Sequence, residues 1–507
     1  MRTMKLAIFF AGLVLTLSPV SCRRPERLLA RFEPDSVPPG GIVVSPDEMR
    51  VAYVCRVGQS RQVVVIGGKR WQPTRDYTDL RFSPDSRSLV GFAREVESAC
   101  AVIDGRRSRQ YDAAWGTGFA FSPDAKRVAY VAERDRRQFV VLDGAEGRRY
   151  DIVGGTGPVF SPDGEHVAYA AANGEVWLVV RDSVEGEGRY DGIWQSRPVF
   201  SPDSRHLAFL AWSSGKKTVV VDDVPGGWYD RVADLPAFSP DGSHFTYAAS
   251  RGNDWVVVLD GKEIASYDSV AVAPGFTADG RPVFRGRRGS EWRVVVDGRE
   301  GAPYDETVGK SPMAFSADGR RIAYKARRGD RWFLVVDGAE QPPYDDVCGD
   351  AAPVFSPDGT RLAYRALLGN KAAIIVDGKE GPWYSGVGKP VFSPDGSRLA
   401  YPARTDSASS IVVVDGQEHG PYQALALGSL VFSPDSRHLA WAAQQGDSWT
   451  VVVDGRPGRW YAGVAIQGSR VTFEGPDRYR YLAGRETEGW YSIYLVRETV
   501  ERPASGP

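Results

Sequence analysis

Aspartate is the residue of this 507-residue chain that combines a regular spacing with the chemistry to bind a cation or transfer a proton. One aspartate returns every 37 to 42 residues, inside a Ser-Pro-Asp-Gly tetrapeptide or a variant of it. These aspartates are Asp47, Asp85, Asp124, Asp163, Asp203, Asp241, Asp279, Asp318, Asp358, Asp395, Asp435 and Asp477. A calcium loop would need the D-x-D-x-D-G pattern with a closing glutamate, which the sequence lacks. We therefore predict that these carboxylates hydrogen-bond the backbone of a turn.

Histidine offers a second chemistry, metal binding, but its placement argues against a metal site. His166, His206, His244 and His438 each lie three residues after the repeated aspartate in four separate repeats, and His419 stands alone. A zinc ion needs ligands that converge to about 2.3 Å from it. The sequence also lacks G-x-S-x-G, P-loop and H-E-x-x-H motifs. The prediction is a protein that is not an enzyme and holds no metal or cofactor.

Each repeat around the aspartate predicts four β-strands. An apolar pair ending in Phe precedes Ser-Pro-Asp-Gly, whose residue types suit the four positions of a type I turn. A short strand such as Leu-Ala-Tyr follows, then a nearly unbroken apolar run such as 412–415, then an Asp-Gly hairpin turn and a tyrosine that begins the fourth strand. An unbroken apolar strand is buried on both faces. Because a period near 40 residues is typical of propeller blades, the sequence predicts an all-β propeller of twelve four-stranded blades.

The twelve blades can be divided in two ways. The common blade number is four to eight, so the favoured arrangement is two six-bladed propellers in tandem, over 31–266 and 267–500. The repeat at 275–286 is the most degenerate internal copy and lies just past the midpoint, where a boundary between rings would fall. One large twelve-bladed ring is the alternative, because no longer linker separates the halves.

The two ends of the repeat array complement each other. The last repeat has three strands and no fourth, whereas 31–47 parallels the end of a repeat, with Phe32 where the tyrosine normally stands. We therefore predict that the N-terminal strand pairs with the last repeat, which removes two exposed sheet edges.

The first residues predict export from the cell. A basic start precedes an apolar run at 6–17 that is too short to span a membrane, as in a signal peptide over 1–21. Cys22 follows a small residue and resembles the acylated first residue of a bacterial lipoprotein, with simple signal-peptide cleavage as the alternative. Residues 22–30 would form a short tether and 501–507 a C-terminal tail. We expect a periplasmic protein, or an outer-membrane or cell-surface lipoprotein that meets the membrane only through its lipid anchor.

Ser-Pro-Asp-Gly followed by Leu-Ala-Tyr in most repeats resembles the WD40-like propeller repeats of the TolB-like group, over nearly the whole chain after the signal. The resemblance implies a bacterial, exported β-propeller that is used for protein–protein contact, and in that group the motif marks six-bladed rings. The sequence shows no counterpart of the helical domain of TolB itself. Partnership in the Tol system is therefore not expected.

Tryptophan marks the predicted binding surface. Most tryptophans recur at fixed repeat positions, which indicates packing, but Trp115, Trp194 and Trp212 fall in segments that vary between repeats. These segments are the connections between blades and the loops between second and third strands, which open onto one rim. Because aromatic residues are common binding anchors, we predict that this rim binds the partner.

The composition narrows the class of partner. The 63 basic and 64 acidic residues give a formal net charge of −1, without the basic excess of a nucleic-acid binder. We predict a non-enzymatic scaffold at the cell envelope that binds a protein or an envelope polymer. The alternative is an envelope hydrolase or lyase that acts on glycan or peptide in a propeller channel.

Overall fold

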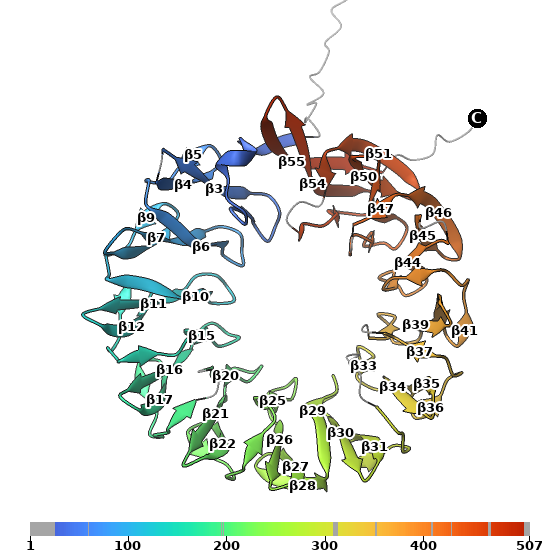
Figure 1. The fold of residues 1–507 in the computed structure, drawn as a ribbon, viewed down its shortest axis with the longest axis horizontal. Coiled ribbons are helices and arrows are strands. Elements are labelled where there is room, and N and C mark those ends of the chain that lie inside the picture. The colour runs from blue at the N-terminus through green and yellow to red at the C-terminus, as the bar shows by residue number, and fades with distance from the viewer. Residues whose placement is uncertain are drawn as a thin grey trace, which may run out of the picture.

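The computed structural model is a ring of twelve β-sheets around a central opening (Figure 1). It describes residues 26–58, 60–193, 195, 197–307, 313–349, 352–406, 409–426, 428–464 and 468–500. Apart from a short 3-10 helix, η1 (Pro34–Ser36), the regular elements of these residues are β-strands. The predicted β-propeller of twelve four-stranded antiparallel blades is therefore confirmed.

All twelve blades belong to one ring, so the favoured division into two six-bladed propellers at 266/267 is wrong and the alternative is right. The sixth blade ends with β28 (Lys262–Tyr267), and the seventh begins with β29 (Ser269–Phe276), which packs against the strands of the sixth. Tyr267 Oη donates a hydrogen bond to Glu300 of the seventh blade at 2.9 Å. Tyr304 and Glu340 make the same bond one blade later, at 3.0 Å. The degenerate repeat thus keeps the contact by which neighbouring blades stack, and the ring continues through it.

The ninth blade illustrates how a repeat folds. Its innermost strand has two pieces, β37 (Asp346–Val347) and β38 (Val354–Phe355), and its outermost strand is β41 (Lys379–Glu380). The third strand is buried on both faces, since Ile374 and Ile375 are both 0% exposed although they point to opposite sides. The unbroken apolar run therefore packs against both neighbouring blades, as the sequence predicts.

The second and third strands form the middle of every blade, and their bounds follow in chain order. The second strands are β3 (Val51–Val57), β7 (Leu89–Arg94), β11 (Val128–Arg134), β16 (Val167–Asn173), β21 (Leu207–Ser213), β26 (Phe245–Arg251), β30 (Pro282–Arg288), β34 (Ile322–Arg328), β39 (Leu362–Leu368), β44 (Leu399–Arg404), β49 (Leu439–Gln445) and β54 (Arg478–Thr487). The third strands are β4 (Arg61–Ile66), β8 (Ala99–Ile103), β12 (Arg137–Leu142), β17 (Val176–Arg181), β22 (Lys216–Val221), β27 (Asp254–Leu259), β31 (Glu291–Val296), β35 (Arg331–Val336), β40 (Lys371–Val376), β45 (Ser410–Val414), β50 (Ser448–Val453) and β55 (Trp490–Thr499).

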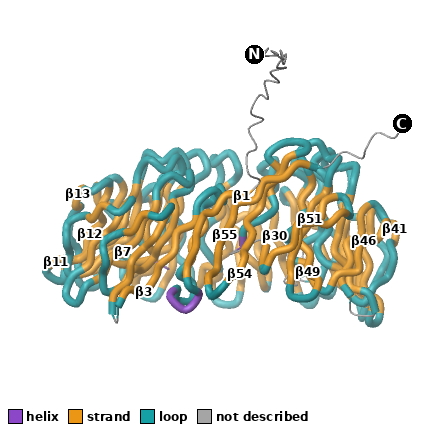
Figure 2. The backbone as a smooth tube through the Cα atoms, turned by 90° about the horizontal axis from the view of Figure 1, so that it is seen from above, coloured by secondary structure: helices purple, strands orange, loops and turns teal. Residues whose placement is uncertain are grey.

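The two ends of the chain close the ring together. β1 (Glu26–Phe32) pairs antiparallel with β55 and supplies the missing fourth strand of the twelfth blade, as predicted; the two strands lie side by side in Figure 2. Phe32 takes the place of the repeated tyrosine and packs against Tyr53 and Tyr491, with ring centroids 5.0 and 5.8 Å away. Glu26 accepts hydrogen bonds from Tyr461 Oη at 2.9 Å and from Arg485 at 2.7 Å.

The Ser-Pro-Asp-Gly turn is held by its own side chains. In the third blade, Ser122 Oγ donates to Asp124 Oδ1 at 2.6 Å, and the backbone N–H of Arg127 donates to Ser122 Oγ at 3.0 Å. The hydrogen bond from Ser122 and the neighbouring Lys126 lower the pKa of Asp124 to about 2. The repeated carboxylate therefore stabilises a turn, which confirms the structural role predicted for it.

In four blades, an arginine three residues after the motif aspartate joins the motif turn to the next blade. Arg361 Nε pairs with Asp377 of its own Asp-Gly hairpin at 3.1 Å. Its Nη1 donates to the carbonyl oxygens of Gly396 and Ser397 in the following motif turn, at 3.1 and 2.8 Å. The guanidinium also lies 5.2 Å from the ring centroid of Phe392 in that blade. Arg127, Arg321 and Arg398 make the same set of contacts elsewhere in the ring.

Candidate functional site

The two rims of the ring differ in their chemistry. Because successive strands of a blade run in opposite directions, the motif turns and the Asp-Gly hairpins lie at one rim, named here the motif rim. The turns between second and third strands and the connections between blades lie at the other, the connection rim. Arg361 and Asp377 join the two turn types of the motif rim. The carboxylate of Asp345, in a blade connection, accepts a hydrogen bond from the N–H of Gly369 in a turn between second and third strands, at 2.7 Å.

The turns of the connection rim are more uniform than the sequence suggests. The aspartate that follows the repeated tyrosine accepts a backbone N–H from the next turn between second and third strands in several blades. Examples are Asp151 with Gly174 at 2.7 Å and Asp230 with Gly252 at 2.6 Å. The same hydrogen bond recurs in these turns and fixes their conformation. They therefore offer little variation on which binding specificity could depend.

The segments that do differ from blade to blade interrupt the innermost strands. We call them the inner loops, and Figure 1 shows them on the inner side of the ring. They read Gly-Gly-Thr-Gly-Pro at 154–158, Ala-Asp-Leu-Pro at 233–236 and Gly-Lys-Pro at 388–390. The strand pieces that flank these three loops are β14 (Ile152–Val153) and β15 (Val159–Phe160), β24 (Arg231–Val232) and β25 (Ala237–Phe238), and β42 (Gly386–Val387) and β43 (Val391–Phe392). Variable chemistry on a rigid scaffold therefore faces the central opening.

Of the predicted anchors, Trp212 has a packing role. It lies in the second strand β21, not in the loop after it, and its backbone pairs with Gly192. A Cβ atom on Gly192 would lie 1.9 Å from the Trp212 ring, so the indole covers the glycine. The Trp212 side chain is half-buried, and its ring packs over Gly192 at the start of the innermost strand of the blade.

The structure gives less on the other predicted site residues. The backbone of Trp115 belongs to the innermost strand β10 (Ala113–Phe121), where it pairs with Val131, so this residue lies in an inner strand instead of a blade connection. Trp194 and Cys22 lie outside the described residues. The binding role of the tryptophans and the acylation of Cys22 stay predictions.

The histidines serve the motif rim. His438 Nδ1 lies 2.6 Å from Asp454 Oδ2 of the neighbouring Asp-Gly hairpin, and the other three motif histidines pair in the same way with their own hairpins. Histidine thus replaces the arginine of other blades. His166 stacks on Phe200 of the next blade, with ring centroids 6.4 Å apart, but among the described residues the motif histidines make no hydrogen bond to the next motif turn. Within the described ranges, no three metal-ligating side chains gather closely enough to hold an ion.

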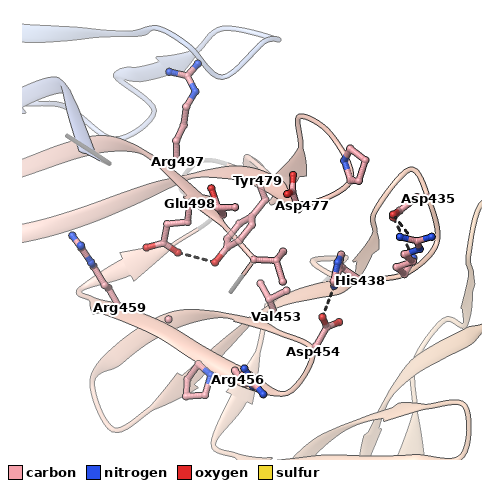
Figure 3. Close-up of a pocket in the computed structure, with 16 residues that line it drawn as sticks. Asp435, His438, Val453, Asp454, Arg456, Arg459, Asp477, Tyr479, Arg497 and Glu498 are labelled. Atoms are coloured by element: carbon pink, nitrogen blue, oxygen red, sulfur yellow. Dashed lines mark hydrogen bonds and ion pairs between the residues drawn. The ribbon is translucent and has the colours of Figure 1, made fainter. Parts of the chain in front are cut away.

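A cavity of about 1320 Å³ lies between the eleventh and twelfth blades, where the ring closes (Figure 3). The Asp-Gly hairpin of the eleventh blade forms one wall, with Asp454, Arg456 and Arg459, and the end of β55 forms the other, with Arg497 and Glu498. We call this cavity the closure cleft. At this junction His438 stands where other blades have the bridging arginine, and the Ser-Pro-Asp-Gly turn of the twelfth blade is replaced by Gly475-Pro476-Asp477-Arg478.

Three of the four carboxylates that line the closure cleft are engaged in structural contacts. Glu498 accepts a hydrogen bond from Tyr479 Oη at 2.8 Å, and Asp454 is paired with His438. Asp435 holds its own turn through Ser433 Oγ at 2.6 Å. These groups are thus not arranged as a free acid–base pair. The degenerate motif at 475–478 was the sequence signal for this cleft.

Comparisons with known proteins gave only distant structural similarities. No known protein family and no curated protein matches the sequence. Among solved structures, TolB from Acinetobacter baumannii is 19% identical over 42% of this chain and 62% of its own, with a TM-score of 0.22. A eukaryotic initiation factor is 12% identical over 73% and 94% of the two chains, with a TM-score of 0.34. The propeller domain of the Trilobed protease from Pyrococcus furiosus is 12% identical over 52% and 94%, with a TM-score of 0.25.

These similarities concern the fold alone, and the match spans less than two thirds of the TolB chain. The twelve four-stranded antiparallel blades themselves define a β-propeller repeat protein. The described part of the chain contains no helix that is long and apolar enough to cross a membrane.

Proposed function

We propose that this protein is an exported, lipid-anchored, non-enzymatic scaffold whose inner loops bind a protein or envelope polymer. The contrast between locked rims and variable inner loops carries the proposal. Motif turns and connection-rim turns repeat the same hydrogen bonds around the ring, whereas the inner loops differ in length and in side chains. Specificity on a repeated scaffold resides where the repeats differ.

Site-specific photo-crosslinking within one blade tests this placement. The sixth blade offers three exposed positions: Asp234 in the inner loop, Asn253 at the connection rim and Lys262 at the motif rim. A benzophenone amino acid at Asp234 should crosslink to a partner in cells that express the protein, and the same group at Lys262 should not. The same group at Asn253 is a control, because it shows whether a partner lies near the connection rim without contacting the inner loop. Crosslinks that form at Lys262 alone would place the binding surface on the motif rim and refute the proposal.

The lipid anchor can be tested separately. Acylation at Cys22 would place the lipid only three residues before β1, which starts at Glu26. A Cys22→Ser variant should move from the membrane fraction to the soluble fraction, and wild-type protein should incorporate a labelled fatty acid. A variant that stays in the membrane fraction and a wild type without label would show that Cys22 carries no anchor.

A further inference from the structure

The motif rim keeps one backbone fold from blade to blade, but its charge changes around the ring. Eight positions define the charge of a blade at this rim: the motif aspartate and the three residues after it, the two hairpin residues after the third strand, and the first two residues of the outermost strand. In the fourth blade these are 163–166 and 182–185, with four carboxylates and no arginine or lysine. In the first blade they are 47–50 and 67–70, with two carboxylates and three cations. The same scaffold therefore presents opposite charges on different arcs of the ring.

Among the first eleven blades, the first two are the ones with more cations than carboxylates at these positions. The second blade, with 85–88 and 104–107, repeats the count of the first. Each blade from the third to the tenth has more carboxylates than arginines and lysines, and the eleventh has equal numbers. The outermost strands β5 (Lys69–Arg70) and β9 (Arg106–Arg107), neighbours in Figure 1, carry two cations each, where seven other blades have glutamate as the second residue. The first hairpin also has Gly67 in place of the usual aspartate.

The cations of these two blades project into solvent. Lys69, Arg70 and Arg106 are exposed, and none of them forms an ion pair with a residue that the structure describes. The side chain of Arg87 is 88% exposed, and its Nε lies 3.8 Å from Asp85. We call Lys69, Arg70, Arg87 and Arg106 the basic arc.

The carboxylates of the same two blades are held in the turns. Asp85 Oδ1 accepts a hydrogen bond from Ser83 Oγ at 2.6 Å, and Asp104 Oδ1 accepts one from the N–H of Leu89 at 2.9 Å. The side chain of Asp85 is 32% exposed, far less than that of Arg87. A partner that approaches this part of the rim therefore meets the cations first.

The chain enters the ring beside the basic arc. Arg27, the second residue of β1, donates from Nη2 to the carbonyl oxygen of Met49 in the motif turn of the first blade, at 2.6 Å. Four residues separate Arg27 from Cys22, so a fully extended chain places their Cα atoms at most about 18 Å apart. No aspartate or glutamate precedes Glu26 in the sequence, and the two residues after Cys22 are both arginines. A lipid on Cys22 would thus hold this part of the motif rim close to a membrane surface.

We propose that the basic arc rests on the anionic phospholipid headgroups of the membrane to which the protein is anchored. Lipid phosphates accept charge-assisted hydrogen bonds from arginine and lysine, and each cation near an anionic surface strengthens the attraction. The acidic fourth to sixth blades lie on another arc of the rim, where an anionic surface would repel them, so the ring would meet the membrane through its first two blades. This inference deepens the proposed function and rests on the proposed export and anchoring for the choice of a lipid as partner.

Co-sedimentation with lipid vesicles tests the basic arc in a protein that begins at residue 23, which carries neither the predicted signal peptide nor the lipid. At low ionic strength we expect binding to phosphatidylcholine vesicles that contain about one third phosphatidylglycerol, and none to pure phosphatidylcholine. Salt at about 0.5 M should release the protein, because it screens the charges.

A triple variant removes cations of the arc without disturbing a turn. Lys69→Gln, Arg87→Gln and Arg106→Gln together should weaken vesicle binding by about tenfold or more, since each cation near an anionic surface contributes about fivefold. Thermal melts would show that the variant is folded.

A matched control removes three exposed cations elsewhere on the motif rim. Arg205→Gln, Lys262→Gln and Arg320→Gln together change the net charge by the same amount. They should alter binding by less than about twofold, because charges farther than about 10 Å from the membrane are screened.

No binding to anionic vesicles at low ionic strength, or equal losses in the two triple variants, would overturn the proposal. Binding to soluble heparin without binding to vesicles would also overturn it, because the arc would then recognise a polyanionic polymer instead of a lipid surface. The test protein lacks the lipid and keeps its inner loops. A failure of the proposed anchor or of the inner-loop binding would therefore appear in the fatty-acid and crosslinking experiments and not in this one.

Discussion

The junction between the ninth and tenth blades and the closing twelfth blade solve the same packing problem with different parts. At the former, Arg361 reaches from one motif turn to the next, and Tyr384 Oη donates to Glu418 at 2.8 Å. At the latter, the turn lacks its serine, His438 stands where other blades have the bridging arginine of the motif rim, and the fourth strand comes from the opposite end of the chain. The closure cleft opens at this second kind of junction.

The tyrosine–glutamate hydrogen bond between neighbouring blades is present at both junctions. Glu26 accepts the hydrogen bond of Tyr461 as Glu418 accepts that of Tyr384, so the closing blade keeps the tyrosine–glutamate bond although it loses the motif turn. Two arginines are added, with Arg459 at 3.1 Å and Arg485 at 2.7 Å from Glu26. Burial opposes ionisation of Glu26, but the hydrogen bond from Tyr461 and the charge of Arg485 outweigh it and lower the pKa of Glu26. The ion pairs with Glu26 therefore provide, at this junction, part of the contact between blades that the motif turn provides elsewhere.

The largest expected effect comes from removal of the closing strand. A protein that begins at residue 33 lacks β1, exposes the edge of β55 and loses the packing of Ala30 and Phe32, each 5% exposed. Phe32→Ala alone should destabilise the ring by about 3–5 kcal/mol, and the deletion should cost more. The exposed edge should also cause self-association. Thermal melts and light scattering would measure both effects, with a protein that begins at residue 26 as the control. A deletion protein that melts like this control as a monomer would show that closure by β1 is dispensable.

A smaller effect is expected when arginine and histidine are exchanged at the position three residues after the motif aspartate, on the motif rim. Arg361→His should keep a partner in Asp377 but lose the bonds to Gly396 and Ser397, at a cost of about 1–2 kcal/mol. The reciprocal change, His206→Arg, should add bonds to the next motif turn and stabilise the fold by up to about 1 kcal/mol. Chemical denaturation of both variants would measure these changes. Equal destabilisation by both would indicate that each residue is fitted to its own blade and that the bridge across blades contributes little.

The sequence predicts the blades well because each blade is a local product of turn chemistry and apolar runs. It also predicts the closing strand, since an orphan strand at one end matches an orphan triplet at the other. It does not predict the size of the ring, because blade number depends on the angle between neighbouring sheets. That angle is set by how side chains such as Tyr267 and Glu300 fill each junction, and a period of about 40 residues fits six blades or twelve equally well.

The candidate site was harder to predict for a spatial reason. Trp212 varies between repeats, which suggested a binding role, but it covers Gly192 in the neighbouring strand. The closure cleft is lined by Asp454 of the eleventh repeat and Arg497 of the twelfth, which only the fold brings together.

The smallest effect is expected from loss of the hydrogen bond between the motif serine and the motif aspartate. Ordinary blades have this hydroxyl donor, whereas the closing blade has Gly475 at the serine position and lacks it. The hydrogen bond from Ser122 is the main cause that lowers the pKa of Asp124 to about 2, and Ser239 does the same for Asp241. An unfolded aspartate titrates near 3.9. Because the folded pKa is the lower one, this stabilisation is complete above about pH 4 and is lost as the pH falls towards 2. Ser122→Ala should therefore lower the melting temperature at pH 6, and the difference from wild type should shrink as the pH falls from 4 to 2.5. A difference that stays constant over this range would mean that Ser122 stabilises the turn only through its bond to the backbone N–H of Arg127.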